Sequence, residues 1–304
     1  MLDLPFDYAS CVRSSEKIQW RLDEVLPEGT PLDFTRPFLP ESLAPTRALT
    51  FLDADQRRKL NQISSNAYLN LFHFVEEFIL ATMTQHAQAE MFGDTHAMRA
   101  LVRFVDEELK HQHLFERYRR SFDSGFGHAC PVLETAAEVA SVVMGHTPIA
   151  VMIITLHIEL MTQQHYVESV KDDEGIDPLF KSLLRHHWLE EAQHARIDAL
   201  ELDKLASAAT PGVVAKGIDE YFEMLDAIDG LLGQQADMDV GSLHTVLGKV
   251  LDGKQAQDVR AAQLSGYRRM FIHTGITNAT FAKTLLKLDP SLQSRLDARA
   301  ALAA

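Results

Sequence analysis

Two copies of the pattern Glu-Glu-x-x-His can do metal chemistry, because carboxylates and imidazoles at this spacing bind metal ions. The copies comprise Glu107, Glu108 and His111, and Glu190, Glu191 and His194. Residues three, four and seven apart share one face of a helix. The second glutamate and the histidine of each copy therefore face the same way as the apolar residues of their helices. Mixed nitrogen and oxygen ligands favour iron or manganese over metals that prefer sulfur.

A lone glutamate interrupts an apolar helix ahead of each copy. In LNLFHFVEEFIL, the first of two adjacent glutamates, Glu76, lies nearer the centre of the apolar face. In VMIITLHIELM the glutamate is Glu159. Glu76 precedes Glu108 by 32 residues, and Glu159 precedes Glu191 by 32 residues. Two helical hairpins of equal length would place each lone glutamate opposite a Glu-x-x-His motif, which is the arrangement of dinuclear carboxylate bundles.

Further histidines surround the second copy. His187 lies four residues before Glu191 on the same inward stripe, whereas His186 points elsewhere. His187 is either a ligand or a histidine that supports a ligand or lies on the surface. We expect His157, His165 and His186 to lie on the surface or in ordinary hydrogen bonds. A single Glu-x-x-His is common by chance, so the prediction of a dinuclear site depends on the two matched copies.

Three acidic residues are candidates for supporting the ligands. Glu107 and Glu190 each precede a predicted ligand and are placed to reach a ligand imidazole on the neighbouring helix, where they would fix its tautomer. The alternative is that both are solvated surface charges. Asp198, four residues after His194, is a weaker candidate for the same role.

With these residues placed, the chain resembles the ferritin-like di-iron superfamily over about residues 60–200. His187 in HHWLEEAQH narrows the resemblance to the p-aminobenzoate N-oxygenase (AurF-type) family, and PLDFTRPFLPESL at 31–43 is similar to the arm of the wider group. The resemblance implies seven metal ligands: Glu76, Glu108, His111, Glu159, His187, Glu191 and His194. It also implies two iron ions, O2 as co-substrate, and a peroxo species that oxygenates an arylamine nitrogen.

The elements that must position these residues are helices. Strongly helical periodicity begins near residue 59, and alternating apolar strands are scarce. We predict an all-α fold in a single domain, 1–304, with a ferritin-like four-helix bundle as its core. Its parts are an irregular, proline-rich N-terminal arm (1–58), the bundle (59–206) and additional C-terminal helices (207–304), with helices at about 213–233, 241–252 and 257–287. Connections are expected at 125–127 and 172–178.

The C-terminal helices are expected to complete a substrate pocket or to form an oligomer interface, for example in a homodimer. Within them, Arg268, Arg269 and His273 interrupt an apolar helix. A guanidinium can bind a substrate carboxylate in a bidentate manner. The alternative for each of the three is a salt bridge or a solvated position.

Composition excludes several classes of function. The 304-residue chain has a formal net charge of −14, which disfavours nucleic acid and anionic membranes as partners. Two distant cysteines and the lack of a signal-peptide pattern at the start of the sequence lead us to expect a cytoplasmic protein. HExxH, GxSxG, Walker A and GxGxxG motifs are absent. Because no nucleotide or flavin site is evident, the electrons for O2 activation should come from an external donor or from the substrate.

The sequence therefore predicts a non-haem di-iron oxygenase or oxidase, of monooxygenase or N-oxygenase type, that oxidises a small organic substrate in an apolar pocket beside the metals. A ferritin-like iron-oxidising and metal-handling protein is the first alternative. The third histidine and the additional C-terminal residues favour the enzyme over it, because storage needs neither. An oxidase with a mixed Mn/Fe cofactor is the second alternative.

Overall fold

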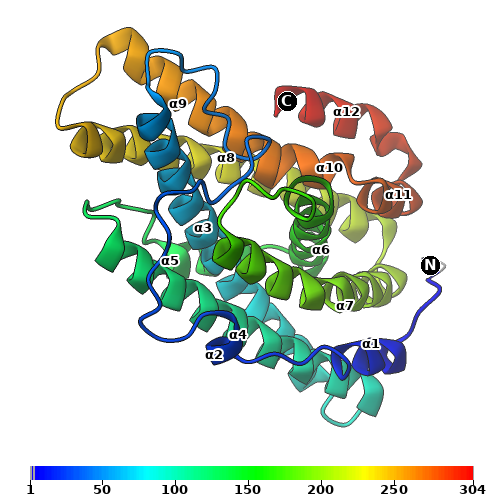
Figure 1. The fold of residues 1–304 in the computed structure, drawn as a ribbon. Helices are drawn as coiled ribbons and strands as arrows, with labels where there is room; N and C mark the ends of the chain where they lie inside the picture. Colours follow the sequence, from blue (N-terminus) through cyan, green and yellow to red (C-terminus); the bar gives the residue numbers. More distant parts are fainter. Residues whose placement is uncertain (1, 3, 304) are drawn as a thin grey trace.

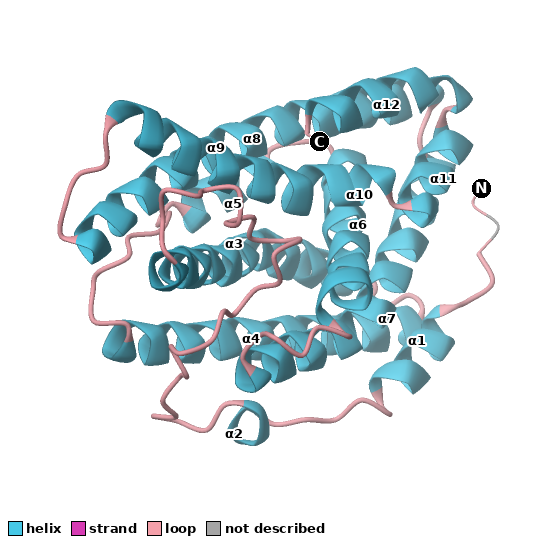
Figure 2. Cartoon of the chain, turned by 45° about the horizontal axis from the view of Figure 1, so that its top comes forward, coloured by secondary structure: helices cyan, strands magenta, loops and turns pink. Residues whose placement is uncertain are grey.

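The computed structural model describes residues 2 and 4–303, and this part of the chain contains helices and no strand (Figure 2). The all-α prediction is thereby confirmed. The helices are α1 (Tyr8–Ser15), α2 (Leu22–Val25), α3 (Ala54–Ala89), α4 (Thr95–Gly125), α5 (Ala136–Val143), α6 (Pro148–His165), η1 (Tyr166–Val170), α7 (Pro178–Ala208), α8 (Pro211–Leu247), α9 (Gly253–Arg268), η2 (Arg269–His273), α10 (Thr274–Thr277), α11 (Ala279–Leu288), η3 (Pro290–Leu292) and α12 (Gln293–Leu302).

The four long helices of the bundle begin at capping residues. Asp53 accepts a hydrogen bond from a first-turn amide of α3, and Asp94 does the same for α4. Thr147 and Asp177 cap α6 and α7, each followed by a proline at the first helical position. Such caps satisfy amides that have no partner within the helix, and proline has the φ angle that a helix start requires. The capping residues and prolines therefore specify where the bundle helices begin.

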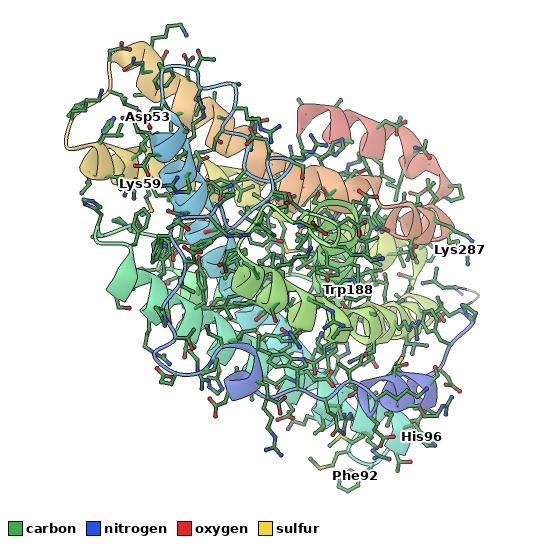
Figure 3. The ribbon with its side chains drawn as sticks, in the orientation of Figure 1. Asp53, Lys59, Phe92, His96, Trp188 and Lys287 are labelled. Atoms are coloured by element: carbon green, nitrogen blue, oxygen red, sulfur yellow. The ribbon has the colours of Figure 1, made fainter. Side chains whose placement is uncertain are left out.

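The bundle consists of two hairpins, α3 with α4 and α6 with α7, and α4 also packs against α7 (Figure 1). Phe92 and His96 mark the turn between α3 and α4, far from Asp53 at the other end of α3 (Figure 3). Nearly every side chain of α6 is buried, because α7, α8 and α10 surround it. A helix that is apolar all round is a buried helix, as α6 is here.

The N-terminal arm is less irregular than its prolines suggest. It contains α1 and α2, which pack against α4 and α7, and α3 already begins at Ala54. Between α2 and α3 the chain runs through a series of turns and is fixed by Asn61, whose Oδ1 accepts hydrogen bonds from the amides of Phe38 and Leu39 at 2.8 and 3.1 Å. The arm is thus an integral part of the folded structure.

Phe38→Ala is expected to lower the free energy of unfolding by about 3–5 kcal/mol, because it removes a large side chain from a close-packed core. The ring of Phe38 has no exposed surface and stacks on Phe180 of α7, with centroids 5.5 Å apart. Chemical denaturation followed by circular dichroism measures the change. The neighbouring Thr35→Ala, at an exposed position, is the control; an equal, small effect of both variants would contradict structural docking of the arm.

The C-terminal region differs from the predicted helix boundaries. The prediction of a break between 233 and 241 is wrong, since α8 continues through it to Leu247. Leu232, Gln235, Ala236 and Asp239 are buried at helical spacing, so packing maintains the helix through the predicted break. The predicted single helix 257–287 is also wrong, because η2 and Asn278 interrupt it.

The π-turn η2 fits closely against α6. The Nε2 atom of His157 lies 3.1 Å from the carbonyl oxygen of Phe271, and its Nδ1 atom lies 2.8 Å from the hydroxyl of Tyr221. A Cβ atom at Gly275, in the adjoining α10, would clash with the His157 ring, so only glycine permits this approach. Among the described residues, no helix combines the length and apolarity needed to cross a bilayer.

Candidate metal centre

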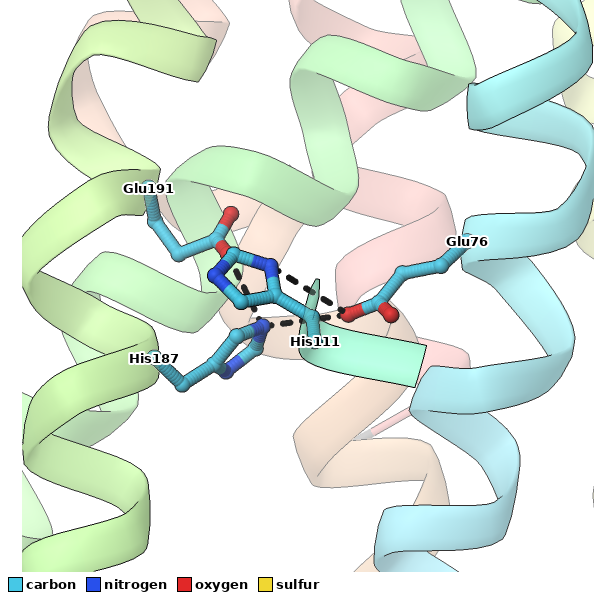
Figure 4. A group of neighbouring side chains, drawn as sticks. All are labelled: Glu76, His111, His187 and Glu191. Atoms are coloured by element: carbon cyan, nitrogen blue, oxygen red, sulfur yellow. Dashed lines mark hydrogen bonds and ion pairs between the residues drawn. The ribbon is translucent and has the colours of Figure 1, made fainter. Parts of the chain in front are cut away.

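Seven acidic and histidine side chains from the four bundle helices meet in the interior. None exposes more than 3% of its surface. They are Glu76 of α3, Glu108 and His111 of α4, Glu159 of α6, and His187, Glu191 and His194 of α7. Figure 4 shows four of them converging from three helices. The structure thus brings together all seven positions that the resemblance implied.

The cluster contains two overlapping groups of four potential ligands. The groups are Glu76, His111, His187 and Glu191, and Glu108, His111, Glu191 and His194. Within each group the ligand atoms lie within 4.8 Å of one another. The two oxygens of Glu191 face different histidines: Oε1 lies 2.8 Å from His187 Nε2, and Oε2 lies 3.5 Å from His194 Nδ1. A carboxylate in this position is suited to bridging two cations.

Glu159 completes the second group from the side of α6. Its Oε2 atom lies 3.9 Å from His194 Nδ1. Together with Glu76, Glu108 and Glu191 it makes four carboxylates in one dry space. Two divalent cations would balance the charge of four carboxylates, whereas uncompensated charges at this depth are costly.

Unpartnered buried atoms show that the cluster fits metal ions. Six ligand atoms have no hydrogen-bond partner among the described residues: Glu76 Oε2, Glu108 Oε2, Glu159 Oε2, Glu191 Oε1, His111 Nδ1 and His194 Nδ1. Buried polar atoms are normally hydrogen-bonded, and leaving one unpaired costs about 1–3 kcal/mol. His194 Nδ1 lies 2.9 Å from Glu108 Oε1 without hydrogen-bond geometry. Two ligands converging on one ion approach each other in this way.

The electrostatics of the cluster are those of crowded, buried carboxylates. Burial and the neighbouring Glu108 carboxylate raise the pKa of Glu76 well above its usual range. Burial and Glu191 do the same to the pKa of Glu159. Burial alone would lower the pKa of His187, but the carboxylates of Glu191 and Glu76 outweigh it and raise that pKa to about 10. Without cations, the cluster therefore retains protons at neutral pH.

Glu107 and Glu190 are buried and orient ligand imidazoles across the bundle. Glu107 Oε2 lies 2.9 Å from His194 Nε2, and Glu190 Oε2 lies 3.0 Å from His111 Nε2. Each imidazole that donates its Nε2 proton to the carboxylate leaves Nδ1, which faces the cluster, free to bind a metal. Glu107 also accepts from Ser15 and Gln193. Burial raises the pKa of Glu107, but the bond and charge of His194, together with the bonds from Ser15 and Gln193, outweigh burial and lower that pKa to about 2.

Glu107→Gln is expected to weaken metal binding by about 10–100-fold, because an amide accepts a weaker hydrogen bond from His194 and fixes its tautomer less firmly. Competition with a chelator of known affinity, under anaerobic conditions, measures the change. Asp106→Asn is the matched control, because Asp106 precedes Glu107 and is exposed. Wild-type affinity in both variants would show that Glu107 does not position a ligand.

Aromatic rings exclude water from the cluster. Phe104 stacks on His194 with centroids 3.8 Å apart, and Phe72 and Phe115 pack edge-on against His187. Trp20, in the arm, lies parallel to His111 at 6.1 Å. Lys110, which is paired with Glu190, lies over the Trp20 ring at 4.1 Å. The position of Trp20 beside His111 was not predicted from the sequence, because a tryptophan in a proline-rich segment does not indicate which residues it contacts.

The remaining acidic candidate, Asp198, lies apart from the hydrogen-bond network. It is fully buried, neither of its oxygens has a hydrogen-bond partner within the part of the chain that the structure describes, and burial raises its pKa well above the usual range. The structure therefore gives Asp198 no bond to a ligand. Three further histidines lie outside the cluster: His157 and His165 are buried against Tyr221 and Tyr68, and His186 bonds the carbonyl of Ser182.

The structure does not bring the three predicted substrate-binding residues to the cluster. Arg268 forms a bidentate ion pair with Asp229 of α8, at 2.6 and 2.7 Å. Arg269 is exposed, and His273 is half-buried beside it on η2. The helix carrying them presents Met270, Phe271 and Ile272 to the core instead. A salt bridge therefore accounts for Arg268.

Comparison with known proteins adds a family and a fold. The model of the p-aminobenzoate N-oxygenase AurF family matches residues 10–212, more than half of the chain. No curated protein matches. Two variants of an R2-like ligand-binding oxidase with an aerobically reconstituted Mn/Fe cofactor have similar structures. One has a TM-score of 0.51 at 12% identity, covering 89% of this chain and 98% of that chain. The other has a TM-score of 0.50 at 11% identity, covering 89% and 94%. The prediction of a ferritin-like fold is confirmed.

Proposed function

Because the chain belongs to the p-aminobenzoate N-oxygenase AurF family, a family of oxidoreductases, we propose that it uses O2 at a dinuclear metal centre to oxidise a small organic substrate. The observation that carries the proposal is the pair of overlapping ligand groups that share His111 and Glu191. We further propose iron in both positions, an amine as substrate and an external electron donor.

The residues of the chain have separable tasks in this proposal. Glu76, Glu108, Glu159 and Glu191 with the three histidines would hold the metals, and the reduced metals would supply the electrons that activate O2. Glu107 and Glu190 hold the imidazoles of His194 and His111 in one tautomer. The surrounding phenylalanines and Trp20 keep bulk water out, which protects a reactive centre from side reactions.

Rapid mixing of the anaerobically reduced protein with O2 tests the proposal. We expect about two iron ions per chain, an O2-dependent optical transient, and faster decay of that transient when an aromatic amine is present. Incorporation of labelled oxygen into the product distinguishes an oxygenase from an oxidase. Steady uptake of many iron ions per chain, with no effect of the amine, would instead identify a metal-handling protein.

Metal analysis distinguishes the di-iron centre from a mixed one. Mixed nitrogen and oxygen ligands accept both iron and manganese, so the donor set does not choose between them. Protein produced with both metals available is expected to contain about two iron ions per chain. A reproducible content of one manganese and one iron would replace the di-iron proposal with a Mn/Fe oxidase.

A further inference from the structure

An apolar cavity of about 420 Å³ lies between α3, α5, α6 and α8. Phe74 and Phe78 of α3, Ile154 of α6 and Leu231 of α8 contribute to its walls. Small-molecule sites are typically concave, mostly apolar spaces of about 300–1,000 Å³ with a few polar groups. The size and lining of this cavity are therefore those of a site for a small aromatic molecule.

The cavity adjoins the metal cluster through two aromatic rings. Phe271 lines the cavity and packs against Phe72, with centroids 5.5 Å apart. Phe72 in turn packs edge-on against the potential ligand His187, at 5.3 Å. On α3, the cavity-lining Val75 directly precedes Glu76. The contacts from Phe271 to Phe72 and from Phe72 to His187 thus connect the wall of the cavity to the cluster through two aromatic rings.

The charges around the cavity are acidic. Glu138 of α5 and Glu223 of α8 lie at its exposed edge, and no lysine or arginine of the described residues lines it. Arg268, one turn before Phe271, is already neutralised by Asp229. A carboxylate entering this space would lose its hydration, find no lysine or arginine among the described lining residues and face two like charges. The lining histidine, His146, directs its Nδ1 to the carbonyl of Val142, at 2.9 Å. A neutral or positively charged group would avoid the repulsion from the two glutamates.

Resting on the function proposed above, we propose that this cavity binds the substrate, an apolar aromatic compound whose solvent-facing end is neutral or cationic and not a carboxylate. Phe72 and Phe271 form the boundary that sets how closely it approaches the metal cluster. His157 Nε2 donates a hydrogen bond to the carbonyl of Phe271, and this bond holds the backbone of the boundary in place.

Calorimetric titration of the full-length protein with three probes of similar size tests this proposal. The probes are 4-methylaniline, which is neutral, benzylamine, which is cationic, and 4-methylbenzoate, which is anionic. We expect both amines to bind at least about tenfold more tightly than the carboxylate. Changing Glu138 and Glu223 together to glutamine should weaken benzylamine and leave 4-methylaniline unchanged, whereas Glu134→Gln, at an exposed position outside the cavity, should change neither.

A steric variant locates the bound amines. Ala227→Trp places an indole at the edge of the cavity and is expected to weaken both amines by at least about tenfold. Ala215→Trp, at an exposed position of the same helix outside the cavity, should bind like wild type. Circular dichroism and thermal unfolding verify that both variants fold.

Two results would overturn the proposal: 4-methylbenzoate binding as tightly as the amines, or wild-type amine affinity in Ala227→Trp. Carboxylate binding that is lost in Lys283→Ala would assign the substrate to the other large groove, about 910 Å³, which Arg196, Lys283 and Lys287 line. The proposed dinuclear function and the proposed cavity can be refuted independently of each other. Amines binding in the cavity of a protein that never loads two metal ions would refute the dinuclear function alone, and metal-dependent O2 use with amines bound elsewhere would refute the cavity alone.

Discussion

Glu191→Ala is expected to abolish dinuclear metal loading, with the metal content falling from about two ions per chain to near zero. Glu191 belongs to both ligand groups, and its two oxygens face different histidines. Its loss therefore removes a ligand from each metal position at once. Elemental analysis after anaerobic reconstitution and desalting measures the content.

Glu190→Ala provides the matched control, because it makes the same chemical change one residue earlier. Glu190 faces the outer nitrogen of His111 and pairs with Lys110, so it supports a ligand without being one. We expect this variant to retain two metal ions at saturating concentration, with an affinity about 10–100-fold lower. Equal metal content in both variants would show that the helical register assigned to α7 is incorrect.

The positions of the cluster residues were predictable because the relevant rules are local. The spacing of Glu191 and His194 fixes a shared helix face, whatever the rest of the chain does. The repeated separation of 32 residues sets the height at which each hairpin returns. These two constraints place the cluster residues of α3 and α4 at one level, and likewise those of α6 and α7.

Features that depend on contacts between distant segments were not predictable. Trp20 reaches His111 only because α1 and α2 fold onto α4 and α7. The continuity of α8 depends on burial of Gln235 and Asp239, which hydrogen-bond to each other and, through Asp239, to Gln263 of α9. Helix propensity and glycine placement carry no information about such partners, so tertiary packing overrode them.

Metal affinity is expected to rise steeply with pH, because the metal-free cluster holds protons that the ions must displace. The raised pKa of His187, about 10, means that its imidazole is protonated at neutral pH. A protonated imidazole has no lone pair for a metal, so a higher pH removes a competitor and strengthens binding. Each proton released contributes about a tenfold gain in affinity per pH unit below that pKa. Anaerobic titrations between about pH 6 and 8 measure the slope.

His187→Gln isolates the contribution of this proton. The variant is expected to bind metal more weakly and to have a slope lower by about one proton, whereas His186→Gln should retain the wild-type slope. His186 is the adjacent histidine, and it is not among the seven cluster residues: its Nδ1 donates to the carbonyl of Ser182 in its own helix, and its ring packs edge-on against Trp20. Calorimetry in buffers of different ionisation enthalpy counts the released protons independently. An unchanged slope in His187→Gln would mean that the imidazole is neutral before metal binds, and that Glu76 and Glu159, whose pKa values are also raised, hold the displaced protons instead.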